Sequence, residues 1–204
     1  SYRAIAMSLQ GQPWPAPMLR KCVSAGEALP AATRALWHAT SRLQIIDGIK
    51  PDGSIPADNP FADKGGVTAQ IWSLGHRNPM GLAFDASGKL WNAEMGPAGG
   101  DELNLVRKGG NYGYSKASNG SHYDGRDIPD HKADDGYDAP VQFWNPSISP
   151  GGLLLYSGTA FPQWGGDAFI AALGGEALIH VDLDGGKAVR SETWAMGARI
   201  RDVE

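Results

Sequence analysis

The chain has 204 residues, enough for one domain with a sizeable core, and its length does not require a second. Its formal net charge is -4 with acidic and basic residues mixed, so it lacks the concentrated positive charge that binds nucleic acids or anionic membranes. The single cysteine, Cys22, excludes an internal disulfide and a thiolate metal cluster. No apolar run approaches the roughly 18 residues of a membrane-spanning helix. We therefore expect no nucleic-acid partner and no membrane insertion.

Glycine and proline carry the first indication of fold class. The chain contains 28 glycines and 14 prolines, interleaved with Trp, Phe and Leu rather than arranged in a collagen-like or low-complexity pattern. This composition is typical of an all-β protein with many turns.

The first 44 residues differ in amino-acid composition from the rest of the chain. Pro13, Pro15 and Pro17 occupy alternate positions, which excludes a helix interior or a central strand there. Residues 30–43 have the spacing of a short, weakly amphipathic helix. We predict a separate segment at 1–44, irregular or helical, and a main domain at 45–204. The abrupt change near residue 45 also suggests a foreign junction or a shifted reading frame.

Short apolar runs separated by turn signals continue from residue 45 to the end. We expect strands at 67–74, 81–84, 89–93, 141–144, 153–156, 168–173, 177–183 and 187–196. This spacing predicts a sandwich, a barrel or a propeller. The hairpin pattern of 81–93 returns loosely at 177–190, and about 40 to 50 residues suffice for one four-stranded blade. We therefore predict a β-propeller fold with about three to four blades.

The hairpin around the turn 85–88 organises the candidate site. Arg77 and Asn78 precede its first strand, and acidic residues follow its second, namely Glu94, Asp101 and Glu102. A folded hairpin brings a guanidinium near oxygen donors, which is suitable for an anionic ligand together with a hard metal ion.

Several longer motifs occur in a fixed order. They are Gly75-His76-Arg77-Asn78-Pro79, Glu94-Met95-Gly96-Pro97, Asp101-Glu102-Leu103-Asn104-Leu105, Asn111-Tyr112-Gly113, Pro146-Ser147-Ile148-Ser149-Pro150 and Arg199-Ile200-Arg201. From about residue 48 the chain resembles the soluble aldose sugar dehydrogenases of the glucose/sorbosone dehydrogenase family. The resemblance implies part of a six-bladed β-propeller that uses pyrroloquinoline quinone (PQQ) and calcium. It covers about half of a complete family member.

The resemblance also implies roles for individual residues. The expected PQQ-binding residues are Arg77, Asn78, Ser147, Arg199 and Arg201. Arg77 would also act in catalysis, by stabilising negative charge that develops on the quinone oxygen. On a strand the last two arginines would face one ligand, because residues two apart point the same way. Without the resemblance, Arg-Asn-Pro is more often a structural turn.

The resemblance implies two calcium sites and a sugar-facing wall. The carbonyls of Gly96 and Pro97 would hold the calcium that bridges to the cofactor, and Asp101, Glu102 and the carbonyl of Tyr112 would form a second calcium site. Residues 99–102 are equally interpretable as a solvated acidic loop. Trp144 and Asn145 would face the aldose, although Trp144 is also a suitable core residue.

Two departures from the family pattern affect the expected activity. The His-Phe-Gly-type motif that carries the family's general base is missing, and neither His38 nor His76 lies in the right context to replace it. Loss of a general base slows a proton-coupled step by roughly 10² to 10⁴. In addition, residues 173–176 read Leu-Gly-Gly-Glu, where many relatives have a cationic residue for the cofactor.

The sequence therefore predicts an oxidoreductase that converts an aldose to its lactone and passes electrons to an external acceptor, with impaired activity unless it assembles with a second copy. The alternative is a noncatalytic, calcium-binding propeller module for interactions. A calcium-dependent lactone hydrolase has less support, because that reaction gives no role to Arg199 and Arg201. A periplasmic or secreted location is implied by the resemblance, although the start Ser1-Tyr2-Arg3 is not a signal peptide.

Overall fold

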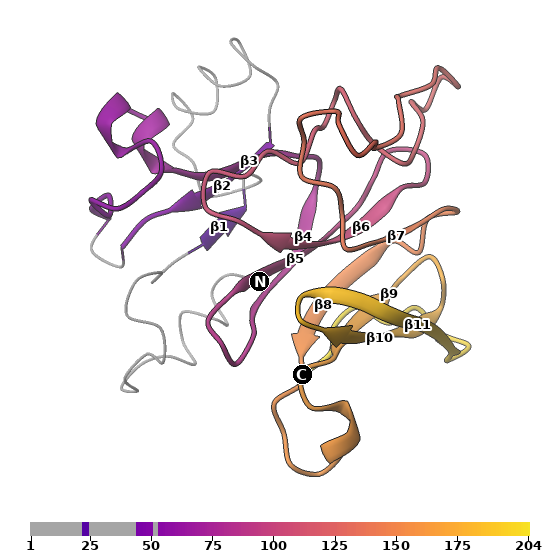
Figure 1. Cartoon of the computed structure of the whole chain (residues 1–204). Coiled ribbons are helices and arrows are strands. Elements are labelled where there is room, and N and C mark those ends of the chain that lie inside the picture. Colours follow the sequence, from indigo (N-terminus) through magenta and orange to yellow (C-terminus); the bar gives the residue numbers. More distant parts are fainter. Residues whose placement is uncertain (1–21, 25–43, 51–52) are drawn as a thin grey trace.

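The computed structural model describes residues 22–24, 44–50 and 53–204, so the helix expected at 30–43 lies outside the described residues. Three antiparallel sheets follow one another along the chain (Figure 1). The first contains β1 (Cys22–Ser24), β2 (Gln44–Gly48) and β3 (Ile71–His76). The second contains β4 (Pro79–Phe84), β5 (Leu90–Glu94), β6 (Asp101–Val106) and β7 (Gln142–Trp144). The third contains β8 (Pro150–Leu155), β9 (Ala168–Ala172), β10 (Ala177–Asp184) and β11 (Lys187–Ala195).

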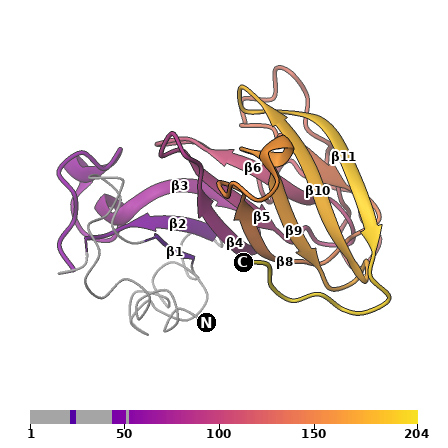
Figure 2. The same ribbon diagram turned by 90° about the horizontal axis from the view of Figure 1, so that it is seen from below.

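These sheets are arranged as consecutive blades of a β-propeller, which confirms the predicted fold class. In the last two sheets each strand pairs with its neighbour in sequence, and Figure 2 shows the sheets standing beside one another rather than joined edge to edge. Three short 3₁₀ turns lie in the connections, at Ala62–Lys64, Thr68–Gln70 and Pro162–Trp164. No helix in the described part of the chain is long and apolar enough to cross a membrane.

The main core lies between the second and third blades. Its fully buried side chains include Trp91, Leu103, Ile170, Ile179 and Val181, which come from both sheets. Each lies on a strand face that is turned away from solvent. Burying such a side chain contributes about 1.5 to 3 kcal/mol to the stability of the fold. The two blades are therefore held together by apolar packing, as an all-β composition rich in short apolar runs predicts.

The predicted hairpin at 81–93 is confirmed as β4 and β5. The Asp85 carboxylate accepts hydrogen bonds from the backbone N–H groups of Ser87 and Lys89 and from the indole of Trp91. Gly88 adopts φ = 80°, a conformation that glycine reaches without a Cβ clash. Burial opposes ionisation of Asp85, but the hydrogen bonds outweigh it and lower its pKa. The turn is thus stabilised by an ionised side chain.

The strand expected at 67–74 is only partly correct. Residues 68–70 form a 3₁₀ turn, and β3 begins at Ile71. Gly65 and Gly66 both have positive φ, so the chain turns immediately before this segment. The Asn59 amide then donates a hydrogen bond to the Ala69 carbonyl, which removes that carbonyl from strand pairing. The apolar pattern alone does not reveal this side-chain contact.

The largest miss in the strand prediction is β6. No strand is predicted from the sequence at residues 101–106, yet they form β6, and five of its six residues are buried. β6 pairs with β5 along its whole length, from Leu90↔Val106 to Glu94↔Glu102. The acidic loop interpretation of residues 101 and 102 is therefore wrong, since both carboxylates lie inside the molecule.

Candidate functional site

Strand register collects the predicted site residues at one end of the blades. Glu94 pairs with Pro79 on one side and with Glu102 on the other, and Asp101 pairs with Trp144. The start of β4, the end of β5, the start of β6 and the end of β7 therefore meet at one edge. A Cβ added to Gly81 of β4 would lie 2.7 Å from Cβ of Leu153 in β8, so the inner strands of the two blades touch.

The Arg77 side chain is half-buried at this end of β4. Its Nη1 donates to the Met95 carbonyl at 3.4 Å, and its Nη2 donates to the Tyr123 hydroxyl at 3.1 Å. Cζ of Arg77 lies 5.6 Å from the centroid of the Tyr123 ring, within the range of a cation–π contact. The expected approach of a guanidinium to the loop after β5 is thus present. Tyr123 was missed, because no residue pattern connects positions 77 and 123.

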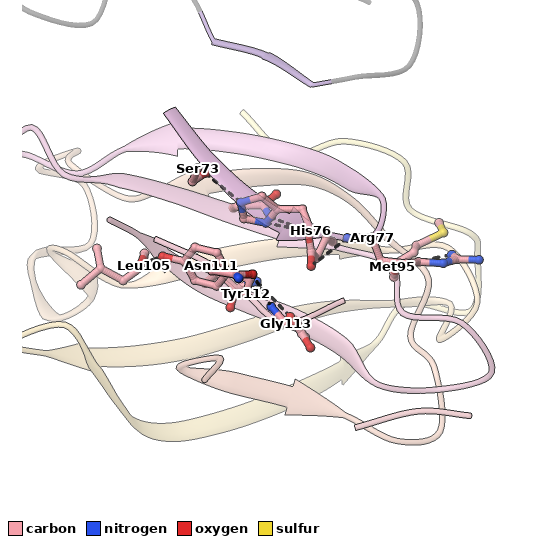
Figure 3. A network of polar contacts seen from close by, with 12 residues as sticks. Ser73, His76, Arg77, Met95, Leu105, Asn111, Tyr112 and Gly113 are labelled. Atoms are coloured by element: carbon pink, nitrogen blue, oxygen red, sulfur yellow. Dashed lines mark hydrogen bonds and ion pairs between the residues drawn. The ribbon is translucent and has the colours of Figure 1, made fainter. Parts of the chain in front are cut away.

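A buried polar network lies directly behind Arg77 (Figure 3). The Ser73 hydroxyl lies 2.8 Å from Nε2 of His76, and Nδ1 of His76 lies 3.1 Å from a Glu94 oxygen. The other Glu94 oxygen accepts the Arg77 backbone N–H at 3.4 Å. The His76 ring also stacks on Tyr112, with centroids 4.6 Å apart. This network fixes the backbone from which the Arg77 side chain projects.

Ser73, His76 and Glu94 are connected in the order of a hydrolytic triad. The burial of these side chains, however, excludes a catalytic role in hydrolysis. Ser73 and His76 have 0% exposure, so no substrate reaches the hydroxyl. A nucleophile must contact the reacting carbonyl. The three side chains are therefore structural, and this arrangement does not support the hydrolase alternative.

Asp101 is fully occupied by hydrogen bonds. One oxygen accepts the Gly96 backbone N–H at 2.9 Å, and the other accepts the Ser147 hydroxyl at 2.6 Å and the Ser149 N–H at 2.8 Å. A carboxylate bonded in this way shapes two loops and has little capacity left for a metal ion. Asp101 therefore supports the site through these hydrogen bonds, and its expected part in the second calcium site stays a prediction.

The loop at Gly96 and Pro97 offers oxygen ligands. Both residues are buried, and within the described part of the chain neither carbonyl accepts a hydrogen bond. A Cβ on Gly96 would lie 2.2 Å from the Gly99 carbonyl oxygen, so this tight loop requires glycine. Buried carbonyls without donors are costly unless water or a cation binds them. The loop thus fits the calcium that the sequence predicts there.

Glu102 points away from Asp101, because neighbouring residues of a strand face opposite sides. Burial and the neighbouring Glu94 charge raise the pKa of Glu102 well above its usual value. Oε1 of Glu102 lies 3.9 Å from the His131 ring, whose own pKa is lowered by burial. A cation near Glu102 would offset this like-charge burial, and among the described residues the Tyr112 carbonyl accepts no hydrogen bond. Among residues 22–24, 44–50 and 53–204, however, no three His, Cys, Asp or Glu side chains converge as metal ligands.

The arginines of the described residues divide into two groups. Arg107, Arg126 and Arg190 form ion pairs with acidic side chains. The other group has no acidic partner within the described residues, and it consists of Arg77, Arg199 and Arg201. These are the three arginines predicted to bind an anionic cofactor.

The expected strand at Arg199 and Arg201 is wrong, because residues 199–204 have irregular backbone. The Arg201 carbonyl accepts the Gly152 N–H at 3.0 Å, which attaches this segment to the beginning of β8. Both arginine side chains are exposed. The prediction that both side chains point toward one ligand assumed a strand, so it has no structural basis. Their lack of acidic partners within the described residues is consistent with anion binding.

Trp144 is half-buried and packs against the main core, while Asn145 is exposed. The Asn145 amide donates to the Asn119 carbonyl at 3.1 Å. Asn145 also lines an open polar cleft of about 430 Å³. The other residues of the cleft are Asn119, Gly120, Ser121, Asp127, Ile128, Pro129 and Asp130. Asn145 is thus placed to meet a small polar molecule, and Trp144 has a core role as well.

Residues 173–176 form the turn between β9 and β10 and contact the loop before β8. The N–H groups of Gly174 and Gly175 both donate to the Ile148 carbonyl, at 3.0 and 3.1 Å. A Cβ on Gly174 would lie 2.6 Å from the Ser149 hydroxyl. In this packing a cationic side chain at position 174 does not fit without a shift, which explains the glycine in physical terms.

Comparison with known protein families identifies the family of this chain. The sequence profile of glucose/sorbosone dehydrogenases matches residues 24–204. The chain belongs to the glucose/sorbosone dehydrogenase family. The match begins within the segment that we separated at 1–44, and the boundary near residue 44 stays a prediction.

Individual family members agree with this assignment. Over 156 residues the chain is 42% identical to an aldose sugar dehydrogenase of Escherichia coli, which covers 74% of this chain and 42% of that protein. The apo-form crystal structure of the soluble aldose sugar dehydrogenase from Escherichia coli superposes with a TM-score of 0.70 at 40% identity, covering 78% of this chain and 47% of the other. A PQQ-bound aldose sugar dehydrogenase from Streptomyces coelicolor gives a TM-score of 0.60 at 28% identity, over 78% and 41% of the two chains. The chain thus spans less than half the length of these relatives.

Proposed function

We propose that this chain carries the cofactor- and metal-binding half of a site that oxidises an aldose at C1 to a lactone, with PQQ and calcium. The observation that carries the proposal is the division of the arginines. Three arginines have acidic partners, and the three expected at the cofactor site have none within the described residues. Unpaired guanidiniums suit a tricarboxylic anion. The PQQ-bound relative supports this choice of cofactor.

The proposed roles of the other residues are those that the family resemblance implies. Arg199 and Arg201 bind carboxylates of the anion, and Asn78 and Ser147 provide neutral hydrogen bonds near it. The carbonyls of Gly96 and Pro97 hold calcium, and Glu102 with the Tyr112 carbonyl holds a second calcium ion. Trp144 and Asn145 border the aldose.

When bound, PQQ supplies the two-electron acceptor for the hydride that leaves the sugar C1, and an external electron acceptor then reoxidises it. The part of Arg77 is electrostatic. Its guanidinium is oriented by two neutral oxygens, the Met95 carbonyl and the Tyr123 hydroxyl, so its positive charge stays available. A fixed charge of this kind stabilises negative charge that develops during the reaction without reorganising.

The proton of the C1 hydroxyl needs a separate acceptor. Of the four described histidines, His122 is half-buried and lies outside the His-Phe-Gly-type motif that the resemblance assigns to the general base. The other three are enclosed, because His76 and His180 are buried with acidic partners and the His131 side chain is 5% exposed. None of these three reaches a sugar. We therefore propose weak or absent turnover by the isolated chain, unless a second copy of the chain supplies the base.

The experiment is anaerobic reconstitution with PQQ and calcium, followed by glucose-dependent bleaching of an electron-acceptor dye. Calcium-dependent bleaching that is lost in Arg77→Ala supports the proposal, with Arg190→Ala as the control, because Arg190 pairs with Glu192 on β11. A folded protein that binds calcium but not PQQ contradicts it. That result favours the alternative, a noncatalytic calcium-binding propeller module.

A further inference from the structure

The segment between β6 and β7 contains a tight hairpin at residues 121–127. Ser121 pairs with Asp127, and the His122 N–H donates to the Arg126 carbonyl at 2.8 Å. Gly125 provides the positive φ of 83° that closes the turn. The Asp124 carboxylate also accepts the Arg126 guanidinium at 2.8 Å. The hairpin therefore has a defined shape of its own.

This hairpin is attached to the loop proposed to bind calcium. The Ala98 N–H donates to the Ser121 carbonyl at 2.9 Å, and the Ser121 N–H donates back to the Ala98 carbonyl at 3.2 Å. Ala98 directly follows Pro97. In addition, a Cβ on Gly100 would lie 2.4 Å from the Gly120 nitrogen, so the two backbones are in close contact. A displacement of the hairpin would thus move the Gly96–Pro97 loop as well.

Tyr123, at the tip of the hairpin, reaches Arg77. Its hydroxyl accepts from Nη2 at 3.1 Å, and its ring lies under the guanidinium at 5.6 Å from Cζ to centroid. Tyr123 is 77% exposed, so hydrophobic burial does not explain the placement of its ring. The contact with Arg77 accounts for it.

The chemistry of the contact is selective. An Asp or Glu at position 123 would also hold the guanidinium, but it would cancel the charge that an anion needs. A phenol and a backbone carbonyl orient the same group and leave the charge intact. Since the guanidinium has five N–H donors, donors remain for a ligand.

We propose that Tyr123 is a positioning residue of the cofactor site, which couples the Arg77 guanidinium to the calcium loop through the hairpin 121–127. This inference rests on the proposed function, because the ligand positioned by Arg77 is the anionic quinone. Tyr123 acts through Arg77 and takes no proton or hydride. Arg77 and the Gly96–Pro97 loop therefore keep a fixed relative placement when the cofactor arrives.

The test uses the full chain with Tyr123→Phe, which removes the hydroxyl, and Tyr123→Ala, which removes the ring as well. Phe161→Ala is the matched control, because Phe161 is an exposed aromatic (47%) on the connection between β8 and β9. PQQ binding is titrated by absorbance in the presence of calcium. Arg side-chain ¹H–¹⁵N spectra of the protein without cofactor report the Arg77 contact directly.

We expect PQQ affinity to fall about 3- to 10-fold in Tyr123→Phe, which matches the net contribution of one solvent-exposed hydrogen bond. Removing the ring should lower it about 2- to 5-fold further, as the loss of an exposed cation–π contact predicts. The Arg77 side-chain signals should broaden in both variants, with unchanged thermal stability and no effect of Phe161→Ala.

The outcomes are separable. Wild-type affinity in both Tyr123 variants, or tighter binding, overturns the role of Tyr123 while leaving the proposed function intact. If the wild-type protein binds no PQQ but its Arg77 signals respond to Tyr123→Phe, the proposed function fails, and with it the positioning role. Arg77 signals that do not respond to either variant show that the contact itself is absent in solution.

Discussion

The Ser147 hydroxyl donates a 2.6 Å hydrogen bond to the Asp101 carboxylate, 46 residues earlier in the chain. Because the same carboxylate also accepts the Gly96 and Ser149 N–H groups, one buried side chain fixes the loop after β5 and the loop before β8. Two blades are thereby connected at the candidate site through polar contacts as well as through the apolar core.

Replacing this carboxylate should be costly. We expect Asp101→Ala to lower the free energy of unfolding by about 3 kcal/mol, since it leaves three donors without their acceptor. Ser147→Ala removes only one of them and should cost about 1 kcal/mol. Urea unfolding of both variants measures the difference. Equal losses in the two variants would show that Asp101 does not organise both loops.

Substitution of Arg77 by lysine tests geometry against charge. Lysine keeps the positive charge but lacks the planar fork that contacts both Met95 and Tyr123. We expect Arg77→Lys to lower dye reduction by the reconstituted protein about 10- to 100-fold, by analogy with the loss of one oriented donor. Arg190→Lys, at the ion pair with Glu192 on β11, is the control. Full activity in Arg77→Lys would mean that charge alone is sufficient.

Calcium should stabilise the fold through Glu102. Its pKa is raised by burial and by Glu94, so the free protein holds an unfavourable pair of acids there. We expect calcium to raise the melting temperature of the wild-type protein, and Glu102→Gln to reduce this rise while making the calcium-free protein no less stable. Glu176→Gln, on an exposed turn, is the control. An unchanged calcium response in Glu102→Gln places the stabilising ion elsewhere, such as at Gly96 and Pro97.

Asp47 should make stability depend on pH. Its carboxylate is fully buried in β2 without a hydrogen-bond partner among the described residues, and burial raises its pKa from 3.8 to about 7. The unfolded chain releases this proton near pH 4 and the folded chain only near pH 7. Stability should therefore fall as the pH rises from about 4 to 7, by about 4 kcal/mol at most.

Asp47→Asn should remove this dependence and leave a flatter stability profile between pH 4 and 7. Melting temperatures across that range, for wild type and variant, provide the measurement. Parallel profiles for the two proteins would contradict an uncharged Asp47 in the fold. Asp63→Asn is a suitable control, because Asp63 is exposed beside Lys64.

Sequence patterns predicted the parts of the fold that depend on local physics. The hairpin at 81–93 followed from a turn whose Asp85 and Gly88 act within a few residues. β6 was missed because the pattern does not show the partners of its acidic residues. Asp101 is bonded to Ser147, 46 residues away, and Glu102 to Asn104 in the same strand. The motif order indicated Arg77, whereas the contact with Tyr123 depends on how the segment between β6 and β7 folds back.

The same distinction applies to the arginines at the chain's end. Their identity was evident from the Arg-Ile-Arg motif, but residues 199–204 have irregular backbone, and the Arg201 carbonyl accepts a hydrogen bond from Gly152 in β8. Their lack of acidic partners is a property of the whole structure. Only the complete set of ion pairs separates these arginines from Arg107, Arg126 and Arg190.

The three unpaired arginines also affect how a ligand arrives. The chain as a whole carries a net charge of -4, so uncompensated positive charge on Arg77, Arg199 and Arg201 is a local exception to a negative protein. Such an arrangement attracts an anion over distances up to the Debye length, about 8 Å at physiological ionic strength, and so speeds encounter before any direct contact forms. Uptake of an anionic cofactor should therefore slow as salt is added.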